Sequence, residues 1–369
     1  MIRWALKSLL ANKGSLLGSA AGIAGAFILV IFFDAVFRGE STQIVAYAEK
    51  TNPHVWVMQK GVANMHMATS FLWDWKADKV RELEGVKLVT PISYLNTIIR
   101  AGEVEAFAFI VGLLPDAERA GPWEMAEGRK IEKSGEVVIP DVLAKLTGTT
   151  LGDKVMITDR AFTIVGLSRG TYSSANAIAF VPFDDLEAIL KSGGTYSFLL
   201  VDLEEGYEAA AMAEKIRTEV EKVNALTQEE FIRNDFAMAM QMGVEIIFMM
   251  SIICSALAAL ITGFTAYMQV VKKKRELAII KAMGAGRASL IFGILIQSAV
   301  IALTGFAMAA GFALVVIPYI PALAPQLTLV VSYGAVANMG LLAMGIAVAG
   351  ALVPAWNVTR LDPAMVFNG

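Results

Sequence analysis

Long hydrophobic stretches occur once near the start of the chain and three times near its end. They cover residues 14–38, 244–268, 289–317 and 333–356, with polar or amphipathic sequence between them. A helix rises about 1.5 Å per residue, so each stretch can cross a hydrocarbon layer about 30 Å thick. The pattern predicts four transmembrane helices, one followed by three.

The first stretch follows a basic segment, so a cleavable signal peptide is the alternative interpretation. The apolar part of a signal peptide has about 7–15 residues, whereas the run at 16–37 is long enough to span. We therefore expect a retained helix. Residues 1–13, in which Lys7 and Lys13 flank leucines, are typical of an amphipathic helix along the inner membrane surface.

Basic residues next to the spans predict their orientation. Arg3, Lys7 and Lys13, the run 272–287 and Arg360 all fall on one side of a four-span chain, which the positive-inside rule places in the cytoplasm. Both termini and the 357–369 tail are then cytoplasmic, as is the loop 269–288. The regions 39–226 and 318–332 are then outside.

The region 39–226 alternates between strand-like and helical patterns. We expect an α/β domain with strands at 55–59, 86–90, 106–112, 155–158, 162–167, 177–182 and 197–202, and helices at 76–84, 142–146, 184–190 and 207–223. Residues 227–243 are predicted to form a polar helical stalk that leads into the second span. The predicted fold class is an integral membrane α-helical protein with a mixed α/β extracytoplasmic domain inserted between the first and second transmembrane helices.

Composition supports this division. Hydrophobic residues make up 56% of the chain, above the roughly 45–50% of soluble domains. The polar region between Arg38 and Asp235 has an excess of acids, which excludes a basic face for nucleic acid. The one cysteine, Cys254, excludes a disulfide within the chain and a cysteine-based zinc site. His54 and His66 are too few for a histidine-rich metal site, and we expect surface or packing roles.

The most basic segment, KKKRELAIIKAMGAGRASLI at 272–291, lies between two spans. As a helix from Lys274 it places Ile279, Ile280 and Met283 on one arc. Lys274, Ala278, Lys281 and Ala282 lie on the opposite side. Glycines at 284 and 286 then end the helix. Periodicity alone leaves two interpretations about equal: a functional surface helix, or a topology signal with an incidental helix.

This segment resembles the RE-x-A-I-x-K-A-x-G-A signature that precedes the third transmembrane helix of MacB-like (type VII) ABC transporter permeases, a family that includes MacB, DevC, LolC/LolE and FtsX. Further similarity lies in 135–157, 162–167 and 179–190, and in the closing PAWNVTRLDPAMVFNG, where Val358 replaces the family's usual alanine. Pro354 and Pro363 are expected to end the last helix there.

The resemblance implies that the segment is a coupling helix that docks on a separate ATPase subunit. The residues expected to contribute are Lys274, Arg275, Glu276, Ala278, Ile279, Ile280, Lys281, Met283 and Gly284. It also implies a dimer, with itself or with a paralogue, in the bacterial inner membrane, contacts with membrane lipid, and, in some branches, a periplasmic adaptor and an outer-membrane duct.

No catalytic motif is apparent. GAGRAS at 284–289 lacks the lysine and the spacing of a phosphate loop, and neither H-E-x-x-H nor G-x-S-x-G occurs. We expect no catalytic residue, metal or cofactor in this chain, with ATP and Mg bound by the partner ATPase.

Other residues are weaker candidates. Met58, Met65, Met67, Phe71, Trp73 and Trp75 either contact a hydrophobic substrate or partner, or form ordinary core, and we favour core. Asp34 and Glu245 are acids near membrane level, where a functional role competes with ordinary capping or solvation, which we favour.

The leading hypothesis is a permease subunit that converts ATP-driven closure of its partner into motion of the outer domain, which moves a lipid, lipoprotein, glycolipid or peptide. The alternative is an FtsX-like, non-transporting mechanical regulator of a cell-wall hydrolase. A membrane-anchored enzyme is the third and least favoured interpretation.

Overall fold

The computed structural model describes residues 2–66, 69–115, 117–173 and 177–360. The chain forms two compact units. The helical unit contains Met1–Arg38, Ile246–Ile320 and Leu329–Gly369, and the α/β unit contains Gly39–Glu245 and Pro321–Thr328. The α/β unit is thus inserted between the first helix and the later three, as the hydrophobic pattern predicts.

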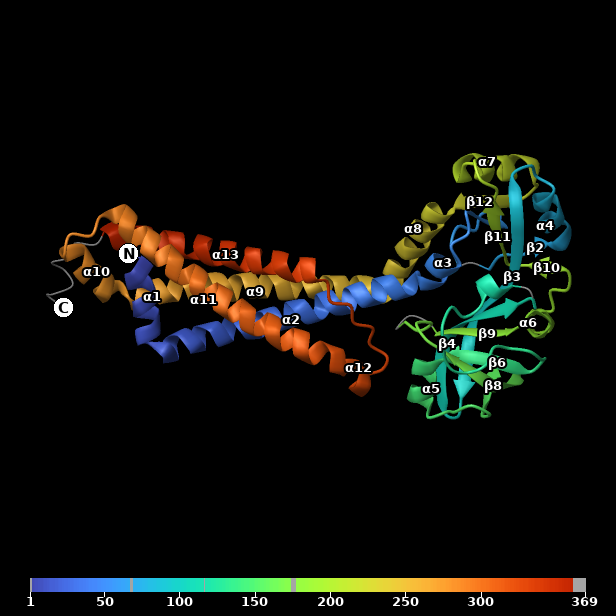
Figure 1. The fold of residues 1–369 in the computed structure, drawn as a ribbon, viewed down its shortest axis with the longest axis horizontal. Helices are drawn as coiled ribbons and strands as arrows, with labels where there is room; N and C mark the ends of the chain where they lie inside the picture. Colours follow the sequence, from blue (N-terminus) through green and yellow to red (C-terminus); the bar gives the residue numbers. More distant parts are fainter. Residues whose placement is uncertain (1, 67–68, 116, 174–176, 361–369) are drawn as a thin grey trace. The chain divides into compact units, whose positions relative to one another are not determined.

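Among the described residues, four helices are long and apolar enough to cross a membrane. Figure 1 shows the long helices α2 Lys13–Ile44, α9 Glu245–Lys272, α11 Arg287–Val316 and α13 Tyr333–Arg360. The shorter helices next to them in the chain are α1 Ile2–Ala11, α10 Lys274–Ala282, η3 Ile317–Tyr319 and α12 Ile320–Leu323. The first long helix extends past Arg38, where we expected it to end.

Glycines permit close approach of helices in the helical unit. A Cβ on Gly305 of α11 would lie 2.7 Å from the carbonyl oxygen of Ala20 on α2. A Cβ on Gly350 of α13 would lie 2.7 Å from the Cα of Gly263 on α9. Both distances are shorter than any normal contact, so these two pairs of backbones touch in the manner typical of membrane helices.

Pro354 does not end the last helix, contrary to the expectation from the sequence. It lies inside α13, which continues to Arg360. Ala351, Ala355 and Val358 are all buried in the core of the helical unit. The same packed side of the helix therefore continues on both sides of the proline, and this packing offsets the backbone hydrogen bond that proline removes. Pro363 lies outside the described residues.

Apolar runs and alternating positions in the α/β unit form the strands predicted from the sequence, and the unit also contains strands that were not predicted. The strands are β1 Val55–Gln59, β2 Leu72–Trp73, β3 Val86–Ala101, β4 Val104–Leu113, β5 Met125–Gly128, β6 Glu136–Pro140, β7 Lys154–Ile157, β8 Arg160–Ser168, β9 Ala177–Pro182, β10 Thr195–Tyr196, β11 Phe198–Leu203 and β12 Val223–Thr227. The helices are α3 Ala46–Thr51, α4 Asp74–Arg81, η1 Glu118–Ala120, α5 Asp141–Thr147, α6 Phe183–Leu190, α7 Ala209–Glu219 and α8 Gln228–Ala239, with the π-helical turn η2 Met240–Val244.

One large sheet organises the unit in the order β12-β1-β11-β3-β4-β9-β6-β8-β5, and β7 pairs with β3 and β8 (Figure 1). β3 is much longer than the predicted strand at 86–90 because it pairs first with β11 and then with β4, and its end also pairs with β7. Ile92 pairs with Phe198 of β11, and the next residue, Ser93, pairs with Gly112 of β4. Pro91 lies beside this change of partner, so it does not end the strand.

The helix predicted at 207–223 is too long. α7 ends at Glu219, and Val223 already belongs to β12, the strand at one end of the sheet order. Lys222 has a left-handed φ of 54°, which is incompatible with continued helix. The expected strand list also lacked the short pair of β2 and β10, because two-residue strands carry almost no periodic signal.

The predicted polar stalk is a capped helix followed by a distortion. The side chain of Thr227 accepts a hydrogen bond from the backbone of Glu230, and the Glu230 carboxylate accepts one from the backbone of Thr227, so α8 begins with a capping box. At the other end, Gly243 has φ 123° inside η2. A conformation so far from helical interrupts the helix before α9, where we had expected it to continue.

Candidate functional site

The predicted coupling helix is present as α10, a separate nine-residue helix between α9 and α11. Lys273 lies at its N-terminal boundary with φ −96°, and the helix ends at Ala282. Gly284 follows with φ 96°, a left-handed conformation that glycine adopts without strain. The chain can therefore turn sharply before α11 begins at Arg287.

The residues of α10 divide into a buried and an exposed set. Leu277 is buried in the core of the helical unit, and Ile280 packs partly against it. Ala278 is also buried. Ile279 is 40% exposed and Met283 is 75% exposed. Ala278 is therefore not accessible to a partner, contrary to its place among the expected docking residues.

The polar members of the predicted set are accessible. Lys274, Arg275 and Glu276 are exposed, and Lys281 is half-buried. Glu276 accepts a hydrogen bond at 3.0 Å from the hydroxyl of Ser8 on α1. Sequence analysis did not single out Ser8, or Leu277 as the apolar anchor of α10.

The Met and aromatic residues between positions 58 and 75 do not form one continuous surface. Met58 and Met65 are 0% and 2% exposed and belong to a core cluster with Trp56, whose ring stacks on Phe231 at 4.1 Å between centroids. Phe71, Trp73 and Trp75 are exposed. The two methionines are core, so only these aromatic residues remain accessible, and Met67 lies outside the described residues.

The two acids near the ends of the spans have ordinary surroundings. Asp34 forms an ion pair at 2.7 Å with Arg38, one helical turn further along α2. Glu245 is exposed in the first turn of α9, where an acid interacts favourably with the helix dipole.

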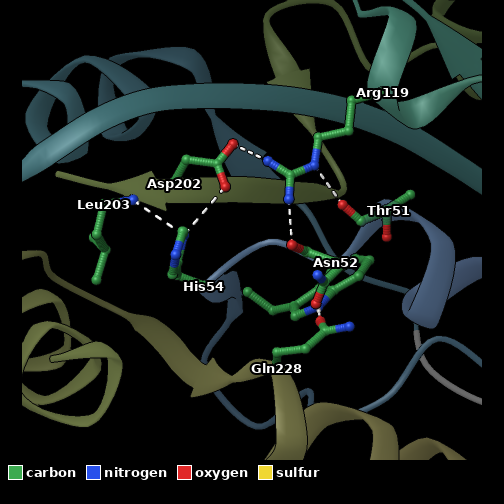
Figure 2. Close-up of polar contacts among 8 residues, drawn as sticks. Thr51, Asn52, His54, Arg119, Asp202, Leu203 and Gln228 are labelled. Atoms are coloured by element: carbon green, nitrogen blue, oxygen red, sulfur yellow. Dashed lines mark hydrogen bonds and ion pairs between the residues drawn. The ribbon is translucent and has the colours of Figure 1, made fainter. Parts of the chain in front are cut away.

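A groove of about 1030 Å³ in the α/β unit is lined by both polar and apolar residues. Figure 2 shows Arg119 at its edge, where the guanidinium donates to the carbonyls of Thr51 and Asn52 and pairs with Asp202. His54 also approaches Asp202, at 3.3 Å from Nδ1 to Oδ1. Arg119 thereby fixes the loop that follows α3 to the end of β11.

Several charged groups of this groove have partners within the chain. The backbone N–H of Thr227 donates to the carboxylate of Glu230, which holds the pKa of that carboxyl below its usual range. His66, elsewhere in the unit, is buried and lies 2.8 Å from Asp235. Over the described ranges, no three His, Cys, Asp or Glu side chains are placed to hold a metal ion.

Comparison with protein families gives two matches that together cover most of the chain. The model of the MacB-like periplasmic core domain matches residues 15–219, and the model of the FtsX-like permease C-terminal region matches residues 248–363. The first match ends within the α/β unit, and the second contains α10.

Curated relatives match over nearly the full length. An uncharacterized ABC transporter permease of Mycobacterium bovis is 21% identical over 352 residues, which cover 93% of this chain and 92% of the relative. Another, of Mycobacterium tuberculosis, is 24% identical over 342 residues, with coverage of 90% and 88%. A third, of Methanocaldococcus jannaschii, is 22% identical over 59% of this chain and 58% of the relative.

Solved structures match over about half of the chain. The periplasmic region of MacB from Actinobacillus actinomycetemcomitans aligns with a TM-score of 0.39 and 14% identity, and covers 52% of this chain and 96% of that one. The extracellular domain of the noncanonic ABC-type transporter YknZ from Gram-positive bacteria aligns with a TM-score of 0.36 and 17% identity, over 48% and 100%.

Proposed function

Since this chain belongs to the family of ABC transporter permeases with a MacB-like periplasmic core domain and an FtsX-like C-terminal region, we propose that it couples ATP hydrolysis in a separate ATPase subunit to motion of its α/β unit. The motion moves a hydrophobic or amphipathic substrate such as a lipid, lipoprotein, glycolipid or peptide. A permease of this family is a membrane subunit with an ATPase partner. The hydrolysis step belongs to that partner, since the chain carries no phosphate-binding loop.

The observation that carries the proposal is the two-sided character of α10. Leu277 anchors the helix in this chain, while Ile279 and Met283 leave apolar surface exposed beside Lys274 and Arg275. Apolar anchors surrounded by charge are typical of specific docking sites between proteins. α10 is therefore the surface that receives the ATPase.

The rest of the proposed assembly follows from family membership and the positive-inside rule. Both termini and α10 are cytoplasmic, and the α/β unit is extracytoplasmic. Two copies of this chain, or this chain and a paralogue, act with two ATPase subunits. A periplasmic adaptor and an outer-membrane duct complete the path in a cell with two membranes.

The test is capture of the ATPase by the tagged, full-length chain purified in mild detergent from its native host. We expect an ABC ATPase to co-purify, and Met283→Glu to lower its recovery about tenfold, because a carboxylate would be buried in the docking site without a partner. Met283 is 75% exposed, so the substitution leaves the chain folded.

The matched control is Leu323→Glu, the same chemical change at an apolar residue of α12 that is 89% exposed. We expect it to retain the ATPase. Capture that is equal for wild type, Met283→Glu and Leu323→Glu would show that α10 is not the docking surface. Absence of any ATPase from the wild-type preparation would contradict the coupling role as a whole.

A further inference from the structure

The start of α10 is held by polar groups from other helices. The hydroxyl of Ser8 on α1 donates to Oε1 of Glu276 at 3.0 Å, and the ammonium of Lys273 donates to the same hydroxyl at 3.0 Å. Ser8 therefore uses both its donor and an acceptor lone pair. These two residues of the coupling region meet at a side chain more than 260 positions earlier in the chain.

Gln297 on α11 extends this set of contacts. Its Oε1 accepts from Lys273 at 3.3 Å, and its Nε2 donates to the backbone carbonyl of Ala5 at 3.2 Å. Gln297 is 7% exposed in a helix that is otherwise almost wholly apolar. A polar side chain in such surroundings is costly unless its donors and acceptors are paired, and here both ends of the amide are used.

The side of α1 that makes these contacts is also its packed side. Ala5 and Leu9 are 0% and 4% exposed, and Ser8 lies between them. Leu6 and Leu10, on the rest of the helix, are 40% and 60% exposed. α1 therefore packs against helices of its own chain, in addition to any contact of its exposed leucines with lipid.

α1 connects the first span, α2, to the start of α10. Asn12 joins α1 directly to α2, and backbone hydrogen bonds continue across the junction from Asn12 to Leu9 and from Leu16 to Asn12. The first span is remote in sequence from α10. Through α1 it is nevertheless connected to the residues at the start of α10.

We propose that Ser8, Lys273 and Gln297 are positioning residues that form a polar clamp with Glu276, so that α1 and α10 move as one body. This rests on the proposed function, in which α10 receives the ATPase. The clamp delivers the displacement of α10 to the first span as well as to α9 and α11, which α10 joins directly.

The first experiment measures the clamp without any partner. Spin labels are placed at two exposed positions, Leu10→Cys and Ala282→Cys, in the full chain with Cys254→Ser, in lipid nanodiscs. With the labelled chain diluted by an excess of unlabelled chain, so that distances between copies do not contribute, pulsed EPR should give one narrow distance. Ser8→Ala should broaden the distribution about twofold, because Lys273 and Glu276 lose the group that joins them, and Ser8→Thr, which keeps the hydroxyl, should restore it.

The matched control is Ser255→Ala. The Ser255 hydroxyl bonds only to the carbonyl of Ser251 in its own helix, so its loss should leave the distribution unchanged. Gln297→Leu should broaden it as Ser8→Ala does. Equal widths for wild type, Ser8→Ala and Gln297→Leu would overturn the clamp.

The second experiment uses the complex with its ATPase, in nanodiscs with ATP as the only added ligand. Ser8→Ala should lower ATP turnover per captured ATPase about threefold, with recovery in Ser8→Thr. Unchanged turnover in Ser8→Ala would overturn the role of the clamp in coupling. If the wild-type chain captures no ATPase, the proposed function fails, whereas the EPR widths still decide whether the clamp exists.

Discussion

Two segments of the chain combine apolar side chains with nearby lysines, and they have different environments. In α10, spacing by three and four residues divides one short helix into a buried set with Leu277 and an exposed set with Met283. In the segment 58–75, Met58 and Met65 are buried while Trp73 is exposed on the short strand β2. In both segments, apolar residues of the same kind are divided between buried and exposed positions, so the local structure decides which side chains are exposed.

The largest expected effect is the difference in stability loss between a buried methionine, Met58, and an exposed one, Met283. Met58→Ala should lower the free energy of unfolding by about 2–5 kcal/mol, because a fully buried side chain leaves a cavity. Met283→Ala should change it by less than about 0.5 kcal/mol, since Met283 is exposed. Thermal denaturation of the purified chain measures both, and similar losses for the two variants would invalidate the comparison.

Gly284 sharpens the comparison at the end of α10. Gly284→Ala should cost about 1 kcal/mol, because its φ of 96° disfavours any residue with a Cβ. Nothing lies within 4 Å of the added Cβ, so the cost is one of backbone conformation alone. Gly286→Ala, at a residue with an ordinary φ of −68°, is the control and should cost less in the same denaturation assay, since it loses only the preference for glycine over alanine at the N-cap of α11.

The smallest effect concerns Lys76, which follows Trp75 at the start of α4. Burial lowers the pKa of Lys76 below its ordinary value of 10.5, and the neighbouring Lys222 lowers it further, while Glu221 opposes this. The folded state therefore releases this proton at a lower pH than the unfolded chain, so stability should rise as the pH approaches 10.5.

Lys76→Met should remove this dependence and leave the stability flatter between neutral pH and 10.5. Lys79→Met changes a lysine of the same helix that is exposed, and serves as the control. Denaturation midpoints of wild type and both variants, measured across this pH range, show whether Lys76 causes the rise in stability. A wild-type stability that falls throughout this range, with no difference from Lys76→Met, would contradict the effect of burial.

Apolar runs of characteristic length allowed much of the fold to be predicted from the sequence. The four long helices and strands such as β1 and β9 are continuous apolar stretches, so local sequence is sufficient. Pro354 was misleading because packing on both sides of it, at Ala351 and Val358, comes from other helices. α7 ends at Glu219 because Val220 is extended, and Lys222 then has a left-handed conformation that lysine rarely adopts.

The candidate site was only partly predictable for a similar reason. The motif identified α10 and its charged residues, but the groups that position it lie far away in the chain. Ser8 and Glu276 are separated by 268 positions, and neither Ser8 nor Gln297 belongs to a motif. A polar residue in an apolar helix, as Gln297 is, was the available signal.

The central claim is that α10 contacts the ATPase, and site-specific photo-crosslinking tests it most directly. A photoreactive benzoylphenylalanine is placed at Met283, or at the exposed Trp73 of the other segment, in the full-length chain in its native membrane. The account predicts a crosslink to an ABC ATPase from position 283 and none from position 73. Absence of the crosslink from position 283, or an equal crosslink from position 73, would contradict it.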